Sequence, residues 1–126
     1  MRPRAVTLTP QELEIMKVVW RLDKATVRAV YEELRQDRTI AYTTVMTMMN
    51  ILEQKGFLTK KDDERSFVYT AKEPQERVVG GMVKEFVDRV FNGAAQPLLL
   101  HLVQDRKLSA GDVAEIERLL KEAKAK

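Results

Sequence analysis

Residues 43–69 read TTVMTMMNILEQKGFLTKKDDERSFVY, and within this stretch the spacing of apolar residues changes from a helical period to a β period. Up to Leu52 the apolar residues recur every three or four positions, which is typical of one buried face of an α-helix. After Gly56, residues 57–61 and 66–70 are β-type runs on either side of a short charged link. The stretch therefore predicts a helix that ends at Gly56, with this glycine as a left-handed cap, and then a β-hairpin.

Two further helices are expected before this stretch. Thr9 and Glu12 have the spacing of a capping box and Pro10 suits the first helical position, so a helix should run from there to about Leu22. Thr26 is expected to cap a second, shorter helix. Three helices followed by a hairpin predict a winged helix-turn-helix, in which the hairpin is the wing. The expected fold class is therefore mainly α, with a small β-hairpin wing.

The composition excludes several classes of protein. The chain has 126 residues, 44% of them hydrophobic, which suffices for one compact core and a small appendage. It contains no Cys, which excludes disulfides and thiolate metal sites, and its single His lacks the partners and spacing of a catalytic or metal site. No apolar run approaches the length of a membrane helix. We therefore expect a cytoplasmic protein that is not an enzyme, binds no cofactor or metal and does not insert into a membrane.

The positive charge lies in the N-terminal part of the chain. Residues 1–72 contain 13 Lys and Arg against 10 Asp and Glu, whereas residues 73–126 contain 9 of each, and the net charge is +3. A basic excess confined to one segment suggests a surface that faces a polyanion, and ordinary solvated charge is the alternative.

The polar face of the third predicted helix suggests what that polyanion is. On a helix over residues 43–54, Thr43, Thr47, Asn50 and Gln54 fall opposite the apolar face and carry no charge. Hydroxyl and amide groups suit hydrogen bonds to base edges, and Asn and Gln are apt partners for adenine. We therefore predict that this helix reads double-stranded DNA in the major groove. A Thr-rich helix that merely faces solvent is the alternative.

Residues around this helix complete the predicted DNA surface. The Met46 side chain is placed to contact a thymine methyl group. The remaining residues are predicted to contact phosphates, which fixes register and adds salt-dependent affinity without sequence information. They are Arg38, Tyr42, Lys55, Lys60, Lys61 and Arg65.

The C-terminal part is predicted to be a helical dimerisation segment. A helix from Pro74 to Asn92, a short apolar helix near residues 96–103 and a last helix capped by Ser109 are too apolar to remain in water. Burial against the same segment of a second chain gives a homodimer, and an intramolecular bundle is the alternative. The predicted interface residues are Val79, Val83, Phe86, Val90, Leu99, Leu102, Ile116 and Leu120. Residues 1–72 would then form the DNA-binding domain and residues 73–126 the dimerisation segment.

Several runs of this sequence resemble the penicillinase repressor family of BlaI/MecI type. They are Leu8–Trp20, Ala41–Thr47, Lys55–Leu58, Asp63–Tyr69 and Asn92–Ala95, and the resemblance spans nearly the whole chain. It implies a dimeric repressor of β-lactamase-type or related stress genes, with inverted-repeat operators containing TACA/TGTA half-sites. It also implies a recognition helix over residues 42–54, in which Thr44 and Thr47 match the motif.

The resemblance also implies a route of induction. In staphylococcal relatives a membrane sensor-protease relay leads to proteolysis within the dimerisation segment, and the corresponding bond here is His101-Leu102, where those relatives have Asn-Phe. Ile51 stands where relatives often have Arg, and Pro97 where many have Ser. Copper-responsive members carry a C-terminal Cys-x-Cys pattern, which this chain lacks.

Two other functions remain open at this point. One is a repressor released by a small hydrophobic ligand, as in regulators of the multiple-antibiotic-resistance type, with Met and Phe side chains lining the pocket. The other is a winged-helix module that binds proteins and never contacts DNA.

Overall fold

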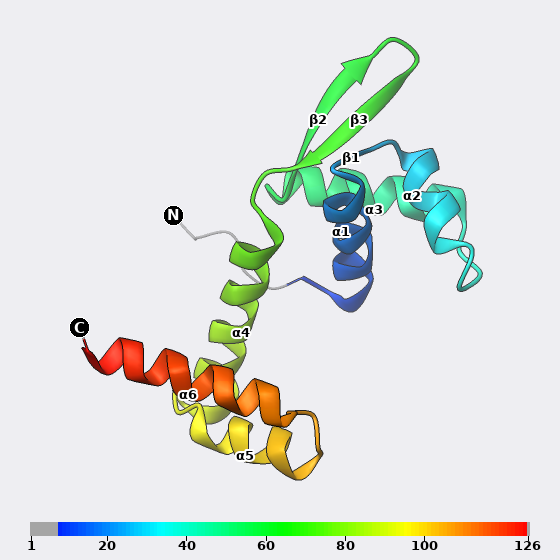
Figure 1. Ribbon diagram of the computed structural model, residues 1–126. Helices are drawn as coiled ribbons and strands as arrows, with labels where there is room; N and C mark the ends of the chain where they lie inside the picture. Colours follow the sequence, from blue (N-terminus) through cyan, green and yellow to red (C-terminus); the bar gives the residue numbers. More distant parts are fainter. Residues whose placement is uncertain (1–7, 126) are drawn as a thin grey trace. The chain divides into compact units, whose positions relative to one another are not determined.

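The computed structural model describes residues 8–125 and divides the chain into two compact units, one that ends at Glu85 and one that begins at Phe86. The first unit contains helices α1 (Pro10–Leu22), α2 (Val27–Leu34) and α3 (Tyr42–Gln54), strands β1 (Lys24–Ala25), β2 (Leu58–Asp63) and β3 (Ser66–Ala71), and the start of α4 (Gln75–Phe91). The second contains the rest of α4 with α5 (Gln96–Gln104) and α6 (Ala110–Ala125) (Figure 1). The predicted fold class, helices with a small β-hairpin wing, is confirmed.

Helix α4 contributes to both units. Val78, in its first turn, is only 7% exposed and belongs to the core of the first unit, and Met82 packs against that core. The boundary between the compact units therefore falls inside α4. The domain boundary predicted from the sequence lies between residues 72 and 73.

The predicted helix starts are made by side-chain caps. At α1 the Glu12 backbone N–H donates to Thr9 Oγ1 at 3.1 Å, and the Thr9 N–H donates to Glu12 Oε1 at 2.9 Å. At α2 the Ala29 N–H donates to Thr26 Oγ1 at 3.0 Å. Each contact satisfies a backbone N–H that has no partner within its own helix, so Thr9 and Thr26 fix where these helices begin.

Gly56 ends α3 as predicted. Its φ of +91° lies in the left-handed region, where a glycine has no Cβ to clash. The Phe57 N–H donates to the Leu52 carbonyl at 2.9 Å and the Gly56 N–H to the Glu53 carbonyl at 3.1 Å, the pattern of a Schellman cap. The turn directs the chain from α3 into the hairpin and buries Phe57, which is 2% exposed.

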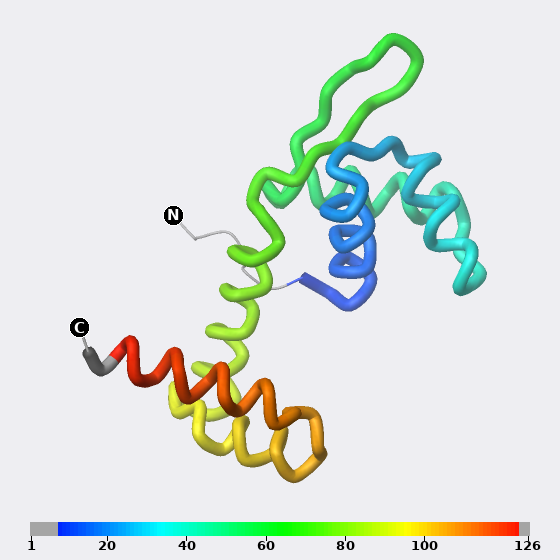
Figure 2. Tube along the Cα trace, viewed as in Figure 1, coloured from blue at the N-terminus to red at the C-terminus, as the bar shows by residue number. Residues whose placement is uncertain are grey.

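The sheet has three antiparallel strands in the order β1-β3-β2. The hairpin is longer than predicted, because Asp62 and Asp63 pair with β3 and the turn consists of Glu64 and Arg65. Backbone hydrogen bonds make this pairing, so it continues through charged side chains that face solvent. The hairpin projects beyond the helices of the first unit (Figure 2). Strand β1 was not predicted, since two residues are too few to show an alternating pattern.

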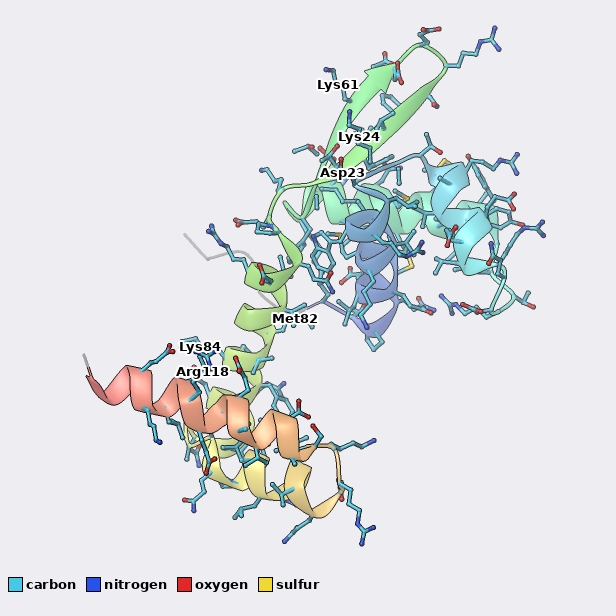
Figure 3. All side chains as sticks on the ribbon, viewed as in Figure 1. Asp23, Lys24, Lys61, Met82, Lys84 and Arg118 are labelled. Carbon is cyan, nitrogen blue, oxygen red and sulfur yellow. The ribbon has the colours of Figure 1, made fainter. Side chains whose placement is uncertain are left out.

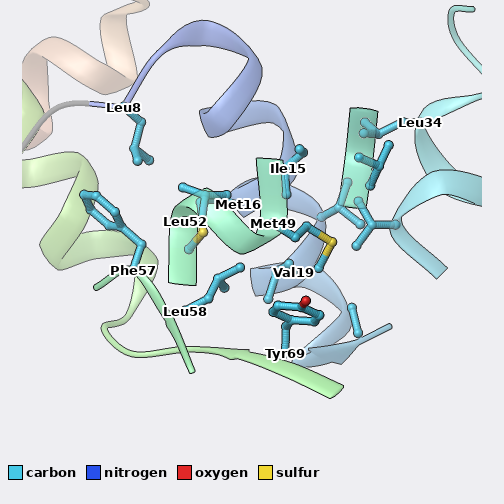
Figure 4. Packing of buried hydrophobic residues seen from close by; sticks show 14 of the residues in the cluster. Leu8, Ile15, Met16, Val19, Leu34, Met49, Leu52, Phe57, Leu58 and Tyr69 are labelled. Atoms are coloured by element: carbon cyan, nitrogen blue, oxygen red, sulfur yellow. The ribbon is translucent and has the colours of Figure 1, made fainter. Parts of the chain in front are cut away.

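The core of the first unit lies between the three helices and the base of the hairpin (Figure 4). On α3, Val45, Met49 and Leu52 are fully buried as predicted, whereas Met48 is half-buried. Helix α1 contacts α2, α3, β1 and β3, and it therefore buries Ile15 and Val18 as well as Met16 and Val19. The core residues with the lowest exposure are Ile15, Met16, Val19, Val30, Val45, Met49, Leu52, Phe57, Leu58 and Tyr69.

The second unit has a different character. Of the side chains described after Val78, none is buried. Large apolar side chains remain exposed on all three of its helices, among them Val90 on α4, Leu100 on α5 and Leu120 on α6, each 46% or more exposed. No helix within residues 8–125 is long and apolar enough to cross a membrane.

Candidate nucleic-acid interface

The outer face of α3 is exposed and uncharged. Thr43, Thr44, Thr47 and Gln54 are all exposed, as the sequence predicts, while the opposite face of the helix is fixed in the core. Met46 is 38% exposed at the edge of the same face. This surface therefore offers hydroxyl, amide and methyl groups, which are the groups that read base edges in a major groove.

Asn50 is not as free as its neighbours on α3. It is half-buried, and its Oδ1 accepts two hydrogen bonds, from Lys60 Nζ at 2.9 Å and from the Tyr69 hydroxyl at 2.9 Å. The prediction of a freely exposed amide at residue 50 is therefore wrong in this respect. The wing packs against this position, and the position of the wing relative to α3 is not visible in the periodicity of α3 alone.

Tyr69 is the buried partner of Asn50. It is 1% exposed, and burial raises the pKa of its hydroxyl above the ordinary value, with further contributions from Glu53 and Tyr42. The hydroxyl therefore keeps its proton at neutral pH and acts as a donor to Asn50.

Lys60 lies over an aromatic side chain of the wing. Its Nζ is 4.4 Å from the centre of the Phe67 ring and 5.9 Å from that of Tyr69, both within the range of a cation–π contact. Phe67 is 45% exposed. It was not predicted as a site residue.

A cleft of about 330 Å³ lies between the start of α2, α3 and the wing. Three cationic side chains line it, Arg28, Lys60 and Arg65, and no acidic side chain does. The Arg28 guanidinium also lies 5.5 Å from the centre of the Tyr42 ring. Arg28 was not predicted, because on the sequence alone it is one of many charged helix residues. The cleft is electropositive and opens beside the outer face of α3.

Lys61 lies on the other face of the hairpin. It lines a separate depression with Lys24, Asp62, Asp63 and Val68, and Figure 3 shows Lys24 and Lys61 on the sheet. Successive residues of a strand point to opposite faces, so Lys60 and Lys61 cannot both line the cleft beside α3.

Two predicted phosphate contacts face carboxylates of α1 instead. Arg38 Nη2 lies 3.0 Å from Glu14 Oε1, and Lys55 Nζ lies 2.9 and 3.0 Å from the two oxygens of Glu12. Glu12 is 6% exposed. Burial by itself raises the pKa of Glu12, but hydrogen bonds from Thr9 and the contact with Lys55 outweigh it, and the pKa is lowered. Lys55 is thus hydrogen-bonded to a carboxylate within the protein. Arg38 is paired with Glu14 by distance, but its Nε and Nη2 have no hydrogen-bond partner among the described residues. Neither carboxylate partner was predicted from the sequence.

The predicted interface residues divide into two groups by exposure. Val83, Phe86, Val90, Leu99 and Leu120 are exposed. Val79, Leu102 and Ile116 are half-buried. His101, on α5 at the predicted cleavage bond, is exposed.

Comparison with known proteins gives consistent matches. The model of the family described as penicillinase repressor matches residues 8–122. The penicillinase repressor of Bacillus licheniformis is 29% identical, over 93% of this chain and 91% of the relative. The transcriptional regulator BlaI of Mycobacterium tuberculosis is 32% identical, over 90% of this chain and 83% of the relative.

Comparison with solved structures also finds similar proteins. The monomeric form of Bacillus licheniformis BlaI in complex with the blaP half-operator is 32% identical, with a TM-score of 0.50 over 60% of this chain and 92% of that chain. The oxidised form of MarR from E. coli, at 17% identity and a TM-score of 0.50 over 94% of this chain and 76% of that chain, is similar in fold alone.

Proposed function

The chain belongs to the penicillinase repressor family, and on this premise we propose that it represses transcription by binding operator DNA through α3 and the wing. Members of the family are DNA-binding transcriptional repressors and not enzymes. The proposed operator is an inverted repeat with TACA/TGTA half-sites, and the proposed target genes encode β-lactamase or related stress functions. The protein would act in the cytoplasm, where the operator lies.

The observation that carries this proposal is an uncharged, exposed helix face beside an electropositive cleft. Thr43, Thr47 and Gln54 offer hydrogen-bonding groups without the desolvation cost of a charge. Lys60 and Arg65 line the cleft next to this face and supply charge for phosphates. Arg28 also lines it, with its Nη1 3.3 Å from Glu32 Oε2. A helix that only faced solvent would not need this arrangement.

The acidic tip of the hairpin limits where the wing contacts DNA. Asp62, Asp63 and Glu64 repel phosphates at close range. We therefore place the phosphate contacts of the wing at Lys60, at the base of the hairpin, and at Arg65, whose long side chain lines the cleft.

The second unit supports the proposal of a homodimer. Leu99 is 38% and Leu120 55% exposed, and burying a large apolar side chain contributes about 1.5–3 kcal/mol. The same surface on a second chain is the simplest cover, since most soluble oligomers have two-fold symmetry. Two α3 helices about 34 Å apart would then read the two half-sites in successive major grooves.

We further propose that proteolysis of the dimerisation segment relieves repression, through a membrane sensor-protease relay. The proposed bond is His101-Leu102 in α5, where the His101 side chain is exposed. Incubation with the sensor-protease, followed by mass spectrometry of the fragments, tests this step. An intact chain under inducing conditions contradicts it, and release of DNA by a small hydrophobic compound without cleavage favours a ligand-released repressor.

The DNA-binding proposal is tested by titrating a duplex with the inverted repeat at several salt concentrations. Gln54→Ala and Gln104→Ala are matched variants, because each removes an exposed amide from the last residue of a helix, α3 or α5. We expect Gln54→Ala to weaken binding by about 1–3 kcal/mol and Gln104→Ala to leave it unchanged. Binding that does not distinguish the operator from random duplex contradicts the proposal and favours a protein-interaction module.

A further inference from the structure

We propose that Asn50 acts on DNA only as a hydrogen-bond donor, and that it selects guanine over adenine at the base pair it faces. This inference rests on the proposed function, because it specifies how one residue of α3 would contribute to sequence preference. It differs from the prediction made from the sequence, in which an amide pairs with adenine.

The orientation of the Asn50 amide is fixed by its partners. Lys60 is a donor that cannot accept, so the amide atom 2.9 Å from its Nζ must be the oxygen and not the nitrogen. The Tyr69 hydroxyl lies 2.9 Å from the same oxygen. An amide oxygen has two lone pairs, and these two contacts occupy both.

The two partners are themselves held in place. Tyr69 is 1% exposed in the core at the base of the hairpin. The Lys60 ammonium is 4.4 Å from the centre of the Phe67 ring, which restricts its position. Asn50 borders the cleft beside the outer face of α3, so its remaining polar group, the Nδ2 amide with two N–H bonds, is the group available to DNA.

The chemistry of base edges turns this restriction into a preference. Guanine presents two neighbouring acceptors in the major groove, N7 and O6, and one amide nitrogen can donate to both. Adenine presents the N7 acceptor beside the N6 donor, and the usual bidentate contact with Asn requires a free amide oxygen. With its oxygen occupied, Asn50 loses one of the two bonds to adenine. Cytosine presents a donor, which meets the Asn50 donor unfavourably.

Gln54 provides a contrast on the same helix. It is exposed, and within residues 8–125 no hydrogen bond reaches its amide oxygen. Gln54 can therefore both donate and accept and remains suited to adenine. The two amides of α3 are expected to read different bases.

The test is selection of binding sites from a library in which one half-site is randomised. The variants are wild type, Asn50→Ala, and the double variant Lys60→Met with Tyr69→Phe, which removes both donors to Oδ1. Wild type is expected to enrich guanine over adenine roughly tenfold at one position. Asn50→Ala should lose that preference at this position alone, and the double variant should shift it toward adenine.

The ratio of bases at the position is the deciding measurement. The double variant also removes a cation from the wing. This loss of charge lowers the affinity for all sequences alike, so by itself it leaves the ratio of guanine to adenine unchanged. The inference is overturned if wild type selects adenine there, if Asn50→Ala alters no position, or if the double variant keeps the wild-type ratio. Replacing the selected guanine by 7-deazaguanine should weaken wild type several-fold and leave Asn50→Ala unaffected.

Failure of the proposed function has a different signature. A protein that enriches no sequence and binds no duplex in a salt-dependent way overturns the proposed function itself. A protein that enriches an inverted repeat, but whose base preferences do not depend on Asn50, overturns only the present inference.

Discussion

Lys55 Nζ lies within 3.0 Å of both carboxylate oxygens of Glu12, so the residue directly after α3 binds the glutamate of the α1 capping box. Glu12 thereby has two roles, since Oε1 also accepts from the backbone N–H of Thr9. The Glu12 side chain is 8% exposed and that of Lys55 31%. The contact joins the first turn of α1 to the C-terminal end of α3 and so positions that end of α3. Other faces of the same two helices form part of the core.

Replacing Lys55 by Met should destabilise the first unit. The change leaves a nearly buried carboxylate without its cation, and we expect the free energy of unfolding at pH 7 to fall by roughly 2 kcal/mol. Urea denaturation followed by circular dichroism measures the change. Lys61→Met, which removes an exposed lysine from the hairpin, is the matched control and should change stability by less than about 0.5 kcal/mol.

The coupling between Glu12 and Lys55 should depend on pH. The pKa of Glu12 is lowered in the folded state, so its contribution is present above the unfolded pKa and is lost as the pH falls through the folded pKa. A double-mutant cycle with Glu12→Gln and Lys55→Met gives the coupling energy. We expect it to be favourable at pH 7 and to disappear in acid below the folded pKa. A coupling that stays constant down to that pH contradicts the assigned role of the Glu12 charge.

Removing Arg65 should weaken DNA binding. It should also reduce how strongly the binding affinity depends on salt concentration. Each phosphate contact contributes about 0.9 to the slope of log affinity against log salt, so Arg65→Ala should lower the slope by roughly that amount. The measurement is a titration of operator and random duplexes between low and moderate salt. Lys121→Ala removes the same charge from α6 of the second unit and should leave the slope unchanged. Equal effects of both variants would indicate a general charge effect instead of a contact.

A charge at Leu120 should dissociate the proposed dimer. Leu120 is 55% exposed on α6, and Leu120→Glu places a carboxylate on the proposed interface. We expect sedimentation to show a shift from dimer to monomer, with the first unit still folded. Ala114→Glu adds the same charge about 120° around α6 from Leu120, outside the proposed interface residues, and should leave the proposed dimer intact. A dimer that survives Leu120→Glu contradicts this assignment of the interface.

The same glycine substitution should have opposite effects at two positions around α4. Gly80 lies within the helix, and a Cβ there would meet nothing within 4 Å, so Gly80→Ala should stabilise the protein by about 0.5–1 kcal/mol. Gly93 follows the helix with a φ of +87°, so Gly93→Ala should destabilise it by a similar amount or more. Thermal unfolding measures both variants.

Local signals in the sequence predicted most of the fold. The caps at Thr9, Thr26 and Gly56 depend on residues within a few positions, and the structure has each of them where the sequence places it. Strand β1 escaped prediction because its pairing with β3 joins residues that are distant in the chain. The outer face of α3 was also predictable from local sequence, because the exposure of its side chains follows the period of one helix.

The partners of charged and polar side chains were not predictable in this way. In the sequence, Lys55 and Arg38 are cations near the ends of the predicted recognition helix, but their partners Glu12 and Glu14 lie on α1. The Asn50 amide likewise meets Lys60 and Tyr69, which come from two strands of the wing. Periodicity says which face a side chain occupies, whereas the partner it meets there depends on tertiary packing.

Trp20 gives the molecule an intrinsic optical probe. Its Nε1 donates to the Glu73 carbonyl at 3.0 Å, at the point where the hairpin leads into α4, and it is the sole tryptophan of the chain. The fluorescence of Trp20 should therefore change when the first unit unfolds and should not change when the second unit unfolds. Comparing it with far-ultraviolet dichroism, to which the helices of both units contribute, would separate the melting of one unit from that of the other without any label.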